Sequence, residues 1–210
     1  TLTAKGVGMV TITASQAANG EYPATSTVYY LKIDKKSITA TANNFEMMYG
    51  DPLPTFTCTY DGIAPGETDD AFTTKTAFAC TATSQSNVGT FTITPSGAVS
   101  SNYNFVFKPG TLTIQKRPLK VTTQNVERVY GNSNPVFTVN YDGFVNGNTF
   151  SVISVKPTAT TPVTAVSPVG EYVITCSGGT ATNYAITYGT AALIVTKAPM
   201  SVKANDFSRA

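Results

Sequence analysis

The sequence contains no histidine and no tryptophan, and only 12% of its 210 residues are charged. The absence of histidine excludes a Ser-His-Asp or Cys-His catalytic device and any metal site with a histidine ligand. Without tryptophan, the aromatic platform typical of a carbohydrate-binding module is poorly supplied, although tyrosines can also stack on sugars. These deficits point away from an enzyme.

Clustered positive charge and long apolar runs are also missing. The net charge is +2, and the lysines and arginines are scattered along the chain. Nucleic acids and anionic membranes are bound by clustered positive charge, so neither is expected as a partner. No apolar stretch approaches the roughly 18 residues that span a membrane. No signal peptide stands at the start, and we expect the chain to be part of a longer secreted precursor.

What the sequence does contain is an internal repeat with a period of 81 residues. Four pairs of short motifs recur at this distance: Tyr49-Gly50 and Tyr130-Gly131, Tyr60-Asp61-Gly62 and Tyr141-Asp142-Gly143, Val88-Gly89 and Val169-Gly170, Asn102-Tyr103 and Asn183-Tyr184. A fixed period predicts tandem modules, each one structural unit. We therefore predict a first module at residues 35–115 and a second at 116–196.

The repeat register continues beyond these two copies. Leu31 and Ile33 precede Leu112 and Ile114 by the same 81 positions, so residues 1–34 are predicted to be the C-terminal part of a preceding module. Lys197, Met200 and Val202 follow Lys116, Leu119 and Val121 in the same way. Residues 197–210 are therefore predicted to be the first strand of a further module. The expected partners are neighbouring modules of the same longer chain.

Within each module, apolar residues alternate with polar ones and turns follow about every ten residues. This pattern predicts an all-β fold of tandem antiparallel β-sandwich (Ig-like) modules. Residues 66–75 and 147–156 are ambiguous and each could hold one short helix, which leaves an α+β grasp-like sheet as the alternative. The predicted core is Phe56, Tyr60, Phe91, Ile93, Tyr103, Phe105, Leu112 and Ile114, with Phe137, Tyr141, Tyr172, Ile174, Tyr184, Ile186, Leu193 and Val195 as counterparts.

These motifs carry a family resemblance. Residues 35–196 resemble, in two copies, the MBG repeats of bacterial surface proteins. The motifs concerned are Tyr130-Gly131-Asn132-Ser133-Asn134-Pro135, Tyr141-Asp142-Gly143-Phe144, Val169-Gly170-Glu171-Tyr172, Asn183-Tyr184 and the junction at residues 193–199. The first copy departs from the pattern at Asp51-Pro52-Leu53 and Ile63-Ala64-Pro65. Residues 1–34 resemble the end of a bacterial Ig-like repeat. The resemblance implies a spacer or adhesion role and brings no catalytic residues.

Several carboxylates and tyrosines are candidate site residues. Most carboxylates fall in turns, where aspartate bonds nearby backbone amides. Asp69 and Asp70 beside Glu67 could attract calcium, but the second copy has no counterpart to them, so we predict no metal site, no cofactor and no catalytic residue. The other carboxylates considered are Asp51, Asp61, Asp142 and Glu171. The tyrosines of the Tyr-Gly and Asn-Tyr pairs are interpreted as core plugs beside turns, with glycan recognition as the alternative.

The three cysteines form no metal-like spacing. Cys58 stands where the second copy has Val139, so it is interpreted as a small buried hydrophobe. Cys80 and Cys176 match Thr161 and Pro95, so neither is a framework position. A Cys58–Cys80 disulfide remains possible if their strands pair.

The leading hypothesis is a non-enzymatic stalk, spacer or filament body in an extracellular protein of the bacterial cell surface. The alternatives are adhesin modules that recognise a glycan or a protein, and a spacer of a secreted multidomain enzyme. The connection between copies is short and contains Pro118, which restricts its own backbone and that of the preceding residue. This predicts restricted hinge motion between modules, and a free first strand at residues 197–210 leaves open association of several copies in a fibre.

Overall fold

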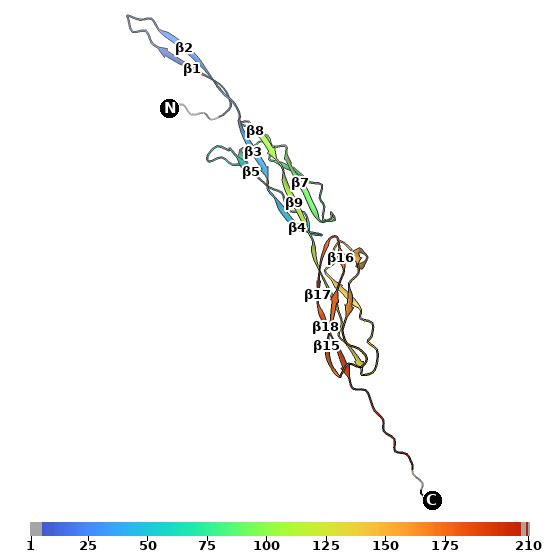
Figure 1. Cartoon of the computed structure of the whole chain (residues 1–210). Coiled ribbons are helices and arrows are strands. Elements are labelled where there is room, and N and C mark those ends of the chain that lie inside the picture. Colours follow the sequence, from blue (N-terminus) through green and yellow to red (C-terminus); the bar gives the residue numbers. More distant parts are fainter. Residues whose placement is uncertain (1–5, 207–208, 210) are drawn as a thin grey trace. The chain divides into compact units, whose positions relative to one another are not determined.

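The computed structural model describes residues 6–206 and 209 (Figure 1). The chain divides into two compact units. Unit 1 consists of residues 1–47, 53–83 and 89–113, and unit 2 of residues 48–52, 84–88 and 114–210. Two loops of the first repeat, residues 48–52 and 84–88, thus belong to the second unit. About half of the chain is in strands.

The first repeat contains two sheets, one of three strands in the order β5-β3-β8 and one of four in the order β4-β9-β7-β6. Their bounds are β3 (Lys36–Ala42), β4 (Phe45–Met48), β5 (Cys58–Asp61), β6 (Ala77–Ala79), β7 (Gly89–Ser96), β8 (Tyr103–Lys108) and β9 (Gly110–Gln115). A short 3₁₀ turn, η1 (Asp69–Ala71), precedes β6. Phe72 follows this turn and enters the core, where it meets Tyr103 edge-on with ring centroids 6.1 Å apart.

The second repeat has the same plan, with sheets in the orders β12-β10-β17 and β11-β18-β15-β14 and a small additional pair, β13-β16. The strands are β10 (Arg117–Thr123), β11 (Val126–Val129), β12 (Val139–Asp142), β13 (Ile153–Val155), β14 (Thr158–Thr160), β15 (Gly170–Ser177), β16 (Thr180–Ala181), β17 (Tyr184–Tyr188) and β18 (Thr190–Thr196). Its 3₁₀ turn is η2 (Phe150–Val152). The prediction of all-β sandwich modules is confirmed, and the two ambiguous segments hold only these three-residue turns.

The pairing within the sheets is mixed. The first strand of each repeat lies beside a late strand and runs parallel to it: β3 pairs with β8, and β10 pairs with β17. β11 likewise runs parallel to β18. The remaining registered pairs are antiparallel, as expected from the hairpin-like turn signals.

Both partners of each parallel pair pass from one sheet to the other at the same level. In the first repeat, one segment changes sheets between β3 and β4, and its parallel neighbour changes sheets between β8 and β9. Asn44 closes this crossing, because its side-chain oxygen accepts the Thr111 N–H at 2.9 Å. Asn125 accepts the Ala192 N–H at 2.8 Å at the corresponding place in the second repeat.

The predicted core register is confirmed. Eight of the predicted residues are buried: Ile93, Tyr103, Leu112, Ile114, Ile174, Tyr184, Leu193 and Val195. The other eight are half-buried: Phe56, Tyr60, Phe91, Phe105, Phe137, Tyr141, Tyr172 and Ile186. The Tyr-Gly pairs differ from expectation, since Tyr49 is 6% exposed but Tyr130 is 43% exposed.

Residues before the first repeat form a single antiparallel hairpin, β1 (Gly8–Gln16) and β2 (Thr25–Ile33). Both faces are largely exposed, including Tyr29 at 61% and Tyr30 at 72%. After the second repeat, residues 197–206 carry no strand, and Met200 is 89% exposed. None of the described segments forms a helix long and apolar enough to cross a membrane. All three cysteines are free thiols, so no disulfide joins Cys58 and Cys80.

The crossing generates a test at Gly110. A Cβ there would lie 2.6 Å from the backbone oxygens of both Ala42 and Asn43. We expect Gly110→Ala to lower the free energy of unfolding by about 1–3 kcal/mol, because backbone rather than a side chain must move. Gly170→Ala is the matched control, since its nearest contact is Tyr172 at 3.7 Å. Urea denaturation measures both, and equal losses would contradict a tight crossing at Gly110.

Candidate functional site

The most organised polar cluster surrounds Tyr184, the first residue of β17, which is 2% exposed. Its phenol oxygen lies 3.2 Å from the Val145 N–H and 2.9 Å from the Asn148 side-chain amide, and it accepts from both. The ring of Phe144 meets it edge-on at 5.4 Å. We call Tyr184, Val145, Asn148, Asn183 and Arg117 the second socket.

Tyr49 fills the second socket. Its ring lies edge-on to Tyr184 with centroids 5.6 Å apart, and its hydroxyl accepts a hydrogen bond from Asn148 Nδ2 at 3.0 Å. One amide nitrogen thus reaches both phenols. The side-chain amides of Asn146 and Asn148 lower the pKa of Tyr49, because donors to the phenol oxygen favour the phenolate.

Arg117 fixes the turn that follows Tyr49. Its guanidinium donates to the Tyr49 carbonyl at 3.1 Å and to the Asp51 carboxylate at 2.7 Å. This bond, together with the Met48 N–H that donates to Asp51 at 3.1 Å, holds the pKa of Asp51 below its ordinary value. Gly50 lies between these residues at φ 87°, and a Cβ on it would stand 2.4 Å from Val145 Cγ2. Only glycine fits this contact.

Asn183 binds the loop at residues 84–88, the second segment of the first repeat that belongs to unit 2. Its side-chain oxygen accepts the Val88 N–H at 3.1 Å, and its side-chain nitrogen donates to Asn87 at 2.8 Å. Asn146 donates to the Ser84 carbonyl at 2.9 Å. A hollow of about 290 Å³ remains between Tyr49, Asn87, Asn148 and Tyr184. The socket therefore binds backbone and side chains of both loops.

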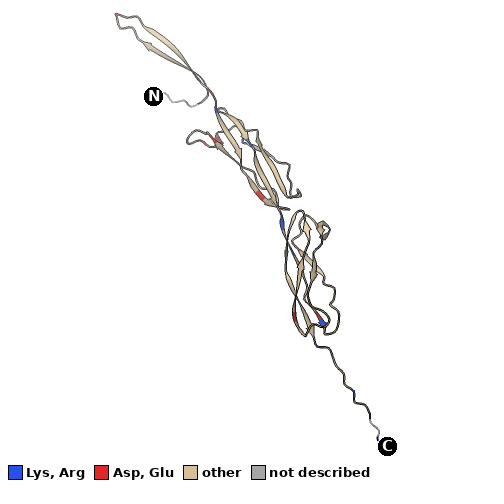
Figure 2. Cartoon of the chain, viewed as in Figure 1, with Lys and Arg blue, Asp and Glu red and all other residues tan. Residues whose placement is uncertain are grey.

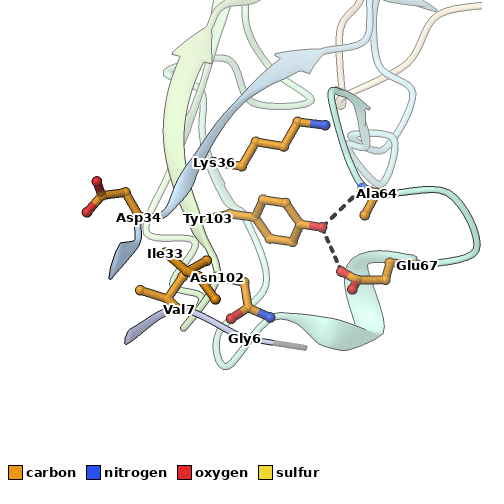
Figure 3. A pocket seen from close by; sticks show the side chains of 9 residues that line it. All are labelled: Gly6, Val7, Ile33, Asp34, Lys36, Ala64, Glu67, Asn102 and Tyr103. Atoms are coloured by element: carbon orange, nitrogen blue, oxygen red, sulfur yellow. Dashed lines mark hydrogen bonds between the residues drawn. The ribbon is translucent and has the colours of Figure 1, made fainter. Parts of the chain in front are cut away.

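The first repeat carries an equivalent cluster around Tyr103, which we call the first socket: Tyr103, Ala64, Glu67, Asn102 and Lys36 (Figure 3). The Tyr103 hydroxyl accepts the Ala64 N–H at 3.1 Å and donates to Glu67 at 2.6 Å. The Glu67 carboxylate raises the pKa of Tyr103, since it stabilises the protonated phenol. A pocket of about 630 Å³ opens beside these residues and is also lined by Val7 and Ile33.

The carboxylates considered from sequence do not converge on one point. Glu67 accepts from Tyr103, whereas Asp69 and Asp70 lie 3.3 and 2.8 Å from Lys75 Nζ. Asp51 pairs with Arg117. Within residues 6–206 and 209, no group of three or more acidic or cysteine side chains is placed to hold a metal ion. Charged residues are spaced along the ribbon (Figure 2), and the adjacent Asp69 and Asp70 of η1 are paired with Lys75.

Both repeats match a known protein family. The family model described as MBG domain (YGX type) matches twice, at residues 38–113 and 119–194. The chain belongs to the MBG domain family of the YGX type. Both matched segments contain the Tyr-Gly-X sequence of that description, Tyr49-Gly50-Asp51 and Tyr130-Gly131-Asn132. The search of curated proteins gave no match.

MBG domains are structural repeat domains associated with bacterial surface proteins. The sequence alone predicts that the Tyr-Gly and Asn-Tyr motifs of this MBG pair are separate turns, each with a tyrosine that packs into the core. The structure brings Tyr49 and Tyr184 together, although they are far apart in sequence. No sequence motif indicates this contact, because Asp51 and Arg117, which pair beside it, are two among 12 acidic and 14 basic residues.

The filled socket predicts unequal effects at the two Tyr-Gly glycines. Gly50 and Gly131 have nearly the same φ, 87° and 91°, so alanine is strained at both. Only Gly50 lies against another residue, because a Cβ on Gly131 meets nothing within 4 Å. We expect Gly50→Ala to cost about 1–3 kcal/mol more unfolding free energy than Gly131→Ala. Thermal and urea unfolding of the two variants measure this, and equal losses would mean that Gly50 is not packed on Val145.

The Asp51–Arg117 pair predicts a pH dependence. The folded state lowers the pKa of Asp51, so its contribution is present above the ordinary aspartate value of about 3.9 and is lost as pH falls through the lower, folded-state pKa. Because both side chains are partly exposed, we expect Asp51→Asn to cost only about 0.2–1 kcal/mol at neutral pH. Urea unfolding from pH 7 to pH 2 should show this difference shrinking to zero. Asp142→Asn, which removes a carboxylate but no salt bridge within the described residues, is the matched control for the loss at neutral pH.

Proposed function

We propose that this chain is a load-bearing spacer in an extracellular protein of the bacterial cell surface. The observation that carries this proposal is the parallel pairing, in each repeat, of strands at its beginning with strands at its end. In the second repeat, residues 117–121 pair with 184–188 and residues 126–129 pair with 193–196. In the first repeat, residues 36–41 pair in the same sense with 103–108.

Parallel pairing decides how a module responds to tension between its ends. Tension on the entering chain and the leaving chain pulls two parallel neighbours in opposite directions along their own axes. The hydrogen bonds between them are then loaded together in shear. In an antiparallel hairpin pulled from its open end, the bonds instead break one after another. A module with parallel terminal strands therefore resists stretching without needing higher equilibrium stability.

Other features are consistent with a mechanical role. Arg117 begins β10 directly after β9 ends at Gln115, so the two repeats are joined by a single residue, Lys116. Lys116 is held to the Ala181 carbonyl at 2.9 Å, and Lys35 is held to the Ser100 carbonyl at 2.8 Å in the first repeat. The membership of the MBG family, a family of structural repeats, also supports the proposal.

Single-molecule force spectroscopy tests this proposal. The chain is pulled from its two ends, and the second repeat is separately pulled through cysteines introduced at the exposed, directly paired positions Thr158 and Ser177. These positions form the open end of the antiparallel β14–β15 pair, so that pull unzips it. The native cysteines are replaced in every variant. We expect pulling from the ends to require several times more force at equal loading rate, since forced unfolding depends on the unfolding barrier.

Urea denaturation of the same cysteine variants is the control for altered stability, and their free energies of unfolding should agree with one another. Similar forces in the two pulling directions would refute a load-bearing role for the terminal strands. The adhesin hypothesis has its own observation, the exposed Tyr29 and Tyr30 of the β1–β2 hairpin. Binding to a glycan array that is abolished by Tyr29→Ser or Tyr30→Ser would favour adhesion over a spacer.

A further inference from the structure

The first socket has every element of the second, but its pocket is open. Tyr103, Asn102 and Lys36 stand at the positions of Tyr184, Asn183 and Arg117. Tyr103 accepts the Ala64 N–H as Tyr184 accepts the Val145 N–H. The ring that meets Tyr103 edge-on is Phe72 from the core of the same repeat, and within the described chain no tyrosine of a Tyr-Gly turn lies on Tyr103 as Tyr49 lies on Tyr184. The pocket of about 630 Å³ lies beside this tyrosine, against about 290 Å³ beside Tyr184.

The β1–β2 hairpin supplies a second, independent part of the same layout. By the 81-residue spacing, Leu31 and Ile33 of β2 correspond to Leu112 and Ile114 of β9. In the first repeat β9 has β4 on one side and β7 on the other, and β4 leads directly into Tyr49. β2 has only β1 beside it in the described structure. Its other edge is therefore the one that a β4-like strand occupies elsewhere.

The connection between strand and tyrosine is the same wherever it is seen. The Tyr49 N–H donates to the Gln115 carbonyl, and the Tyr130 N–H donates to the Thr196 carbonyl, both at 2.9 Å. The corresponding carbonyl after β2 belongs to Asp34, which lines the open pocket (Figure 3). A strand added to β2 would thus deliver its following tyrosine to Tyr103.

We propose that the first socket and the free edge of β2 together bind a β-strand that ends in a Tyr-Gly turn, supplied by another MBG module. The strand pairs in parallel with β2, as β11 pairs with β18. Its tyrosine packs edge-on against Tyr103 and its glycine lies against Ala64. This binding site does not depend on the mechanical role proposed above.

The side chains of the first socket fit this occupant. Lys36 replaces Arg117 and places a cation where the residue after Tyr-Gly arrives, so aspartate is preferred there over asparagine. Glu67 replaces Asn148, and because a phenol can donate as well as accept, the incoming tyrosine donates to this carboxylate. Lys36 and Tyr103 both project towards the loop that carries Ala64 and Glu67 (Figure 3).

A peptide probe tests the proposal on the whole chain. The peptide has the sequence of residues 45–51, which ends in Tyr-Gly-Asp. We expect it to shift the amide NMR resonance of Ala64, which bonds Tyr103, and those of β2. The Val145 amide is the internal control, since Tyr49 already fills that socket and no shift is expected there. A seven-residue segment covers less than a standard interface, so we expect a Kd between about 10 µM and 1 mM.

Matched variants separate the socket from unspecific strand addition. A peptide with serine in place of its tyrosine should bind at least about tenfold more weakly, because an aromatic anchor dominates a small interface. Lys36→Ser should weaken the Tyr-Gly-Asp peptide by up to about fivefold and leave a Tyr-Gly-Asn peptide unchanged, as for an exposed ion pair. Tyr49→Ala should still leave the Val145 amide unshifted by the peptide, because β4 continues to occupy the edge of β9 that the peptide's strand would need.

Several results would overturn the proposal. It fails if the Ala64 amide does not shift up to millimolar peptide, or if Ala64 and Val145 shift equally in the unaltered chain. It also fails if only β2 responds while the serine peptide binds as well as the tyrosine peptide, because that is edge pairing without a socket. The comparison of Ala64 with Val145 uses the unaltered chain, so the test holds even if Tyr49→Ala does not fold.

Discussion

In each repeat, two strands cross from one sheet to the other while hydrogen-bonded side by side, and the module is organised around this crossing. The crossing joins the two sheets covalently at two neighbouring points, one on each crossing segment, so neither sheet can slide over the other. In the first repeat Gly110 permits the close approach, and in both repeats an asparagine, Asn44 or Asn125, bridges the two segments. Because one crossing strand opens the repeat and the other closes it, their parallel pairing also lies on the path of any tension between the module's ends.

The Tyr-Gly turn depends on that crossing. β4 and β11 follow the point where the chain changes sheets, and each is followed by a tyrosine whose N–H bonds the carbonyl at the end of the last strand. The turn is thus fixed at the point where one repeat ends. The Asn-Tyr pair at the start of β8 or β17 lies in space beside the first residue of the repeat's first strand, because the two strands run parallel. One repeating sequence consequently provides both an occupant and a socket.

The two sockets show how identical geometry is adjusted by a few side chains. Asn148 donates to two phenols and helps to lower the pKa of Tyr49, the occupant of the second socket, whereas Glu67 accepts from one phenol and raises the pKa of Tyr103, a member of the first socket itself. The small number of charged residues makes each ion pair distinctive. Arg128 is a further adjustment, since it is buried in the second repeat and donates to the side chain of Asn134 and to backbone carbonyls, where the first repeat has Met47.

The sequence by itself determined the repeat, its period, the all-β class and the register of the core. Alternation places Ile93, Leu112 and Ile114 on one face whatever the sheet order, because side-chain direction in a strand is local. The parallel pairing of β3 with β8 was not contained in that pattern, since alternation carries no information about which strands are neighbours. Tyr49 and Tyr130 show the same limit at the site. Their local sequences are alike, yet one is buried and the other exposed, because burial there depends on whether a socket from a distant part of the chain covers the ring.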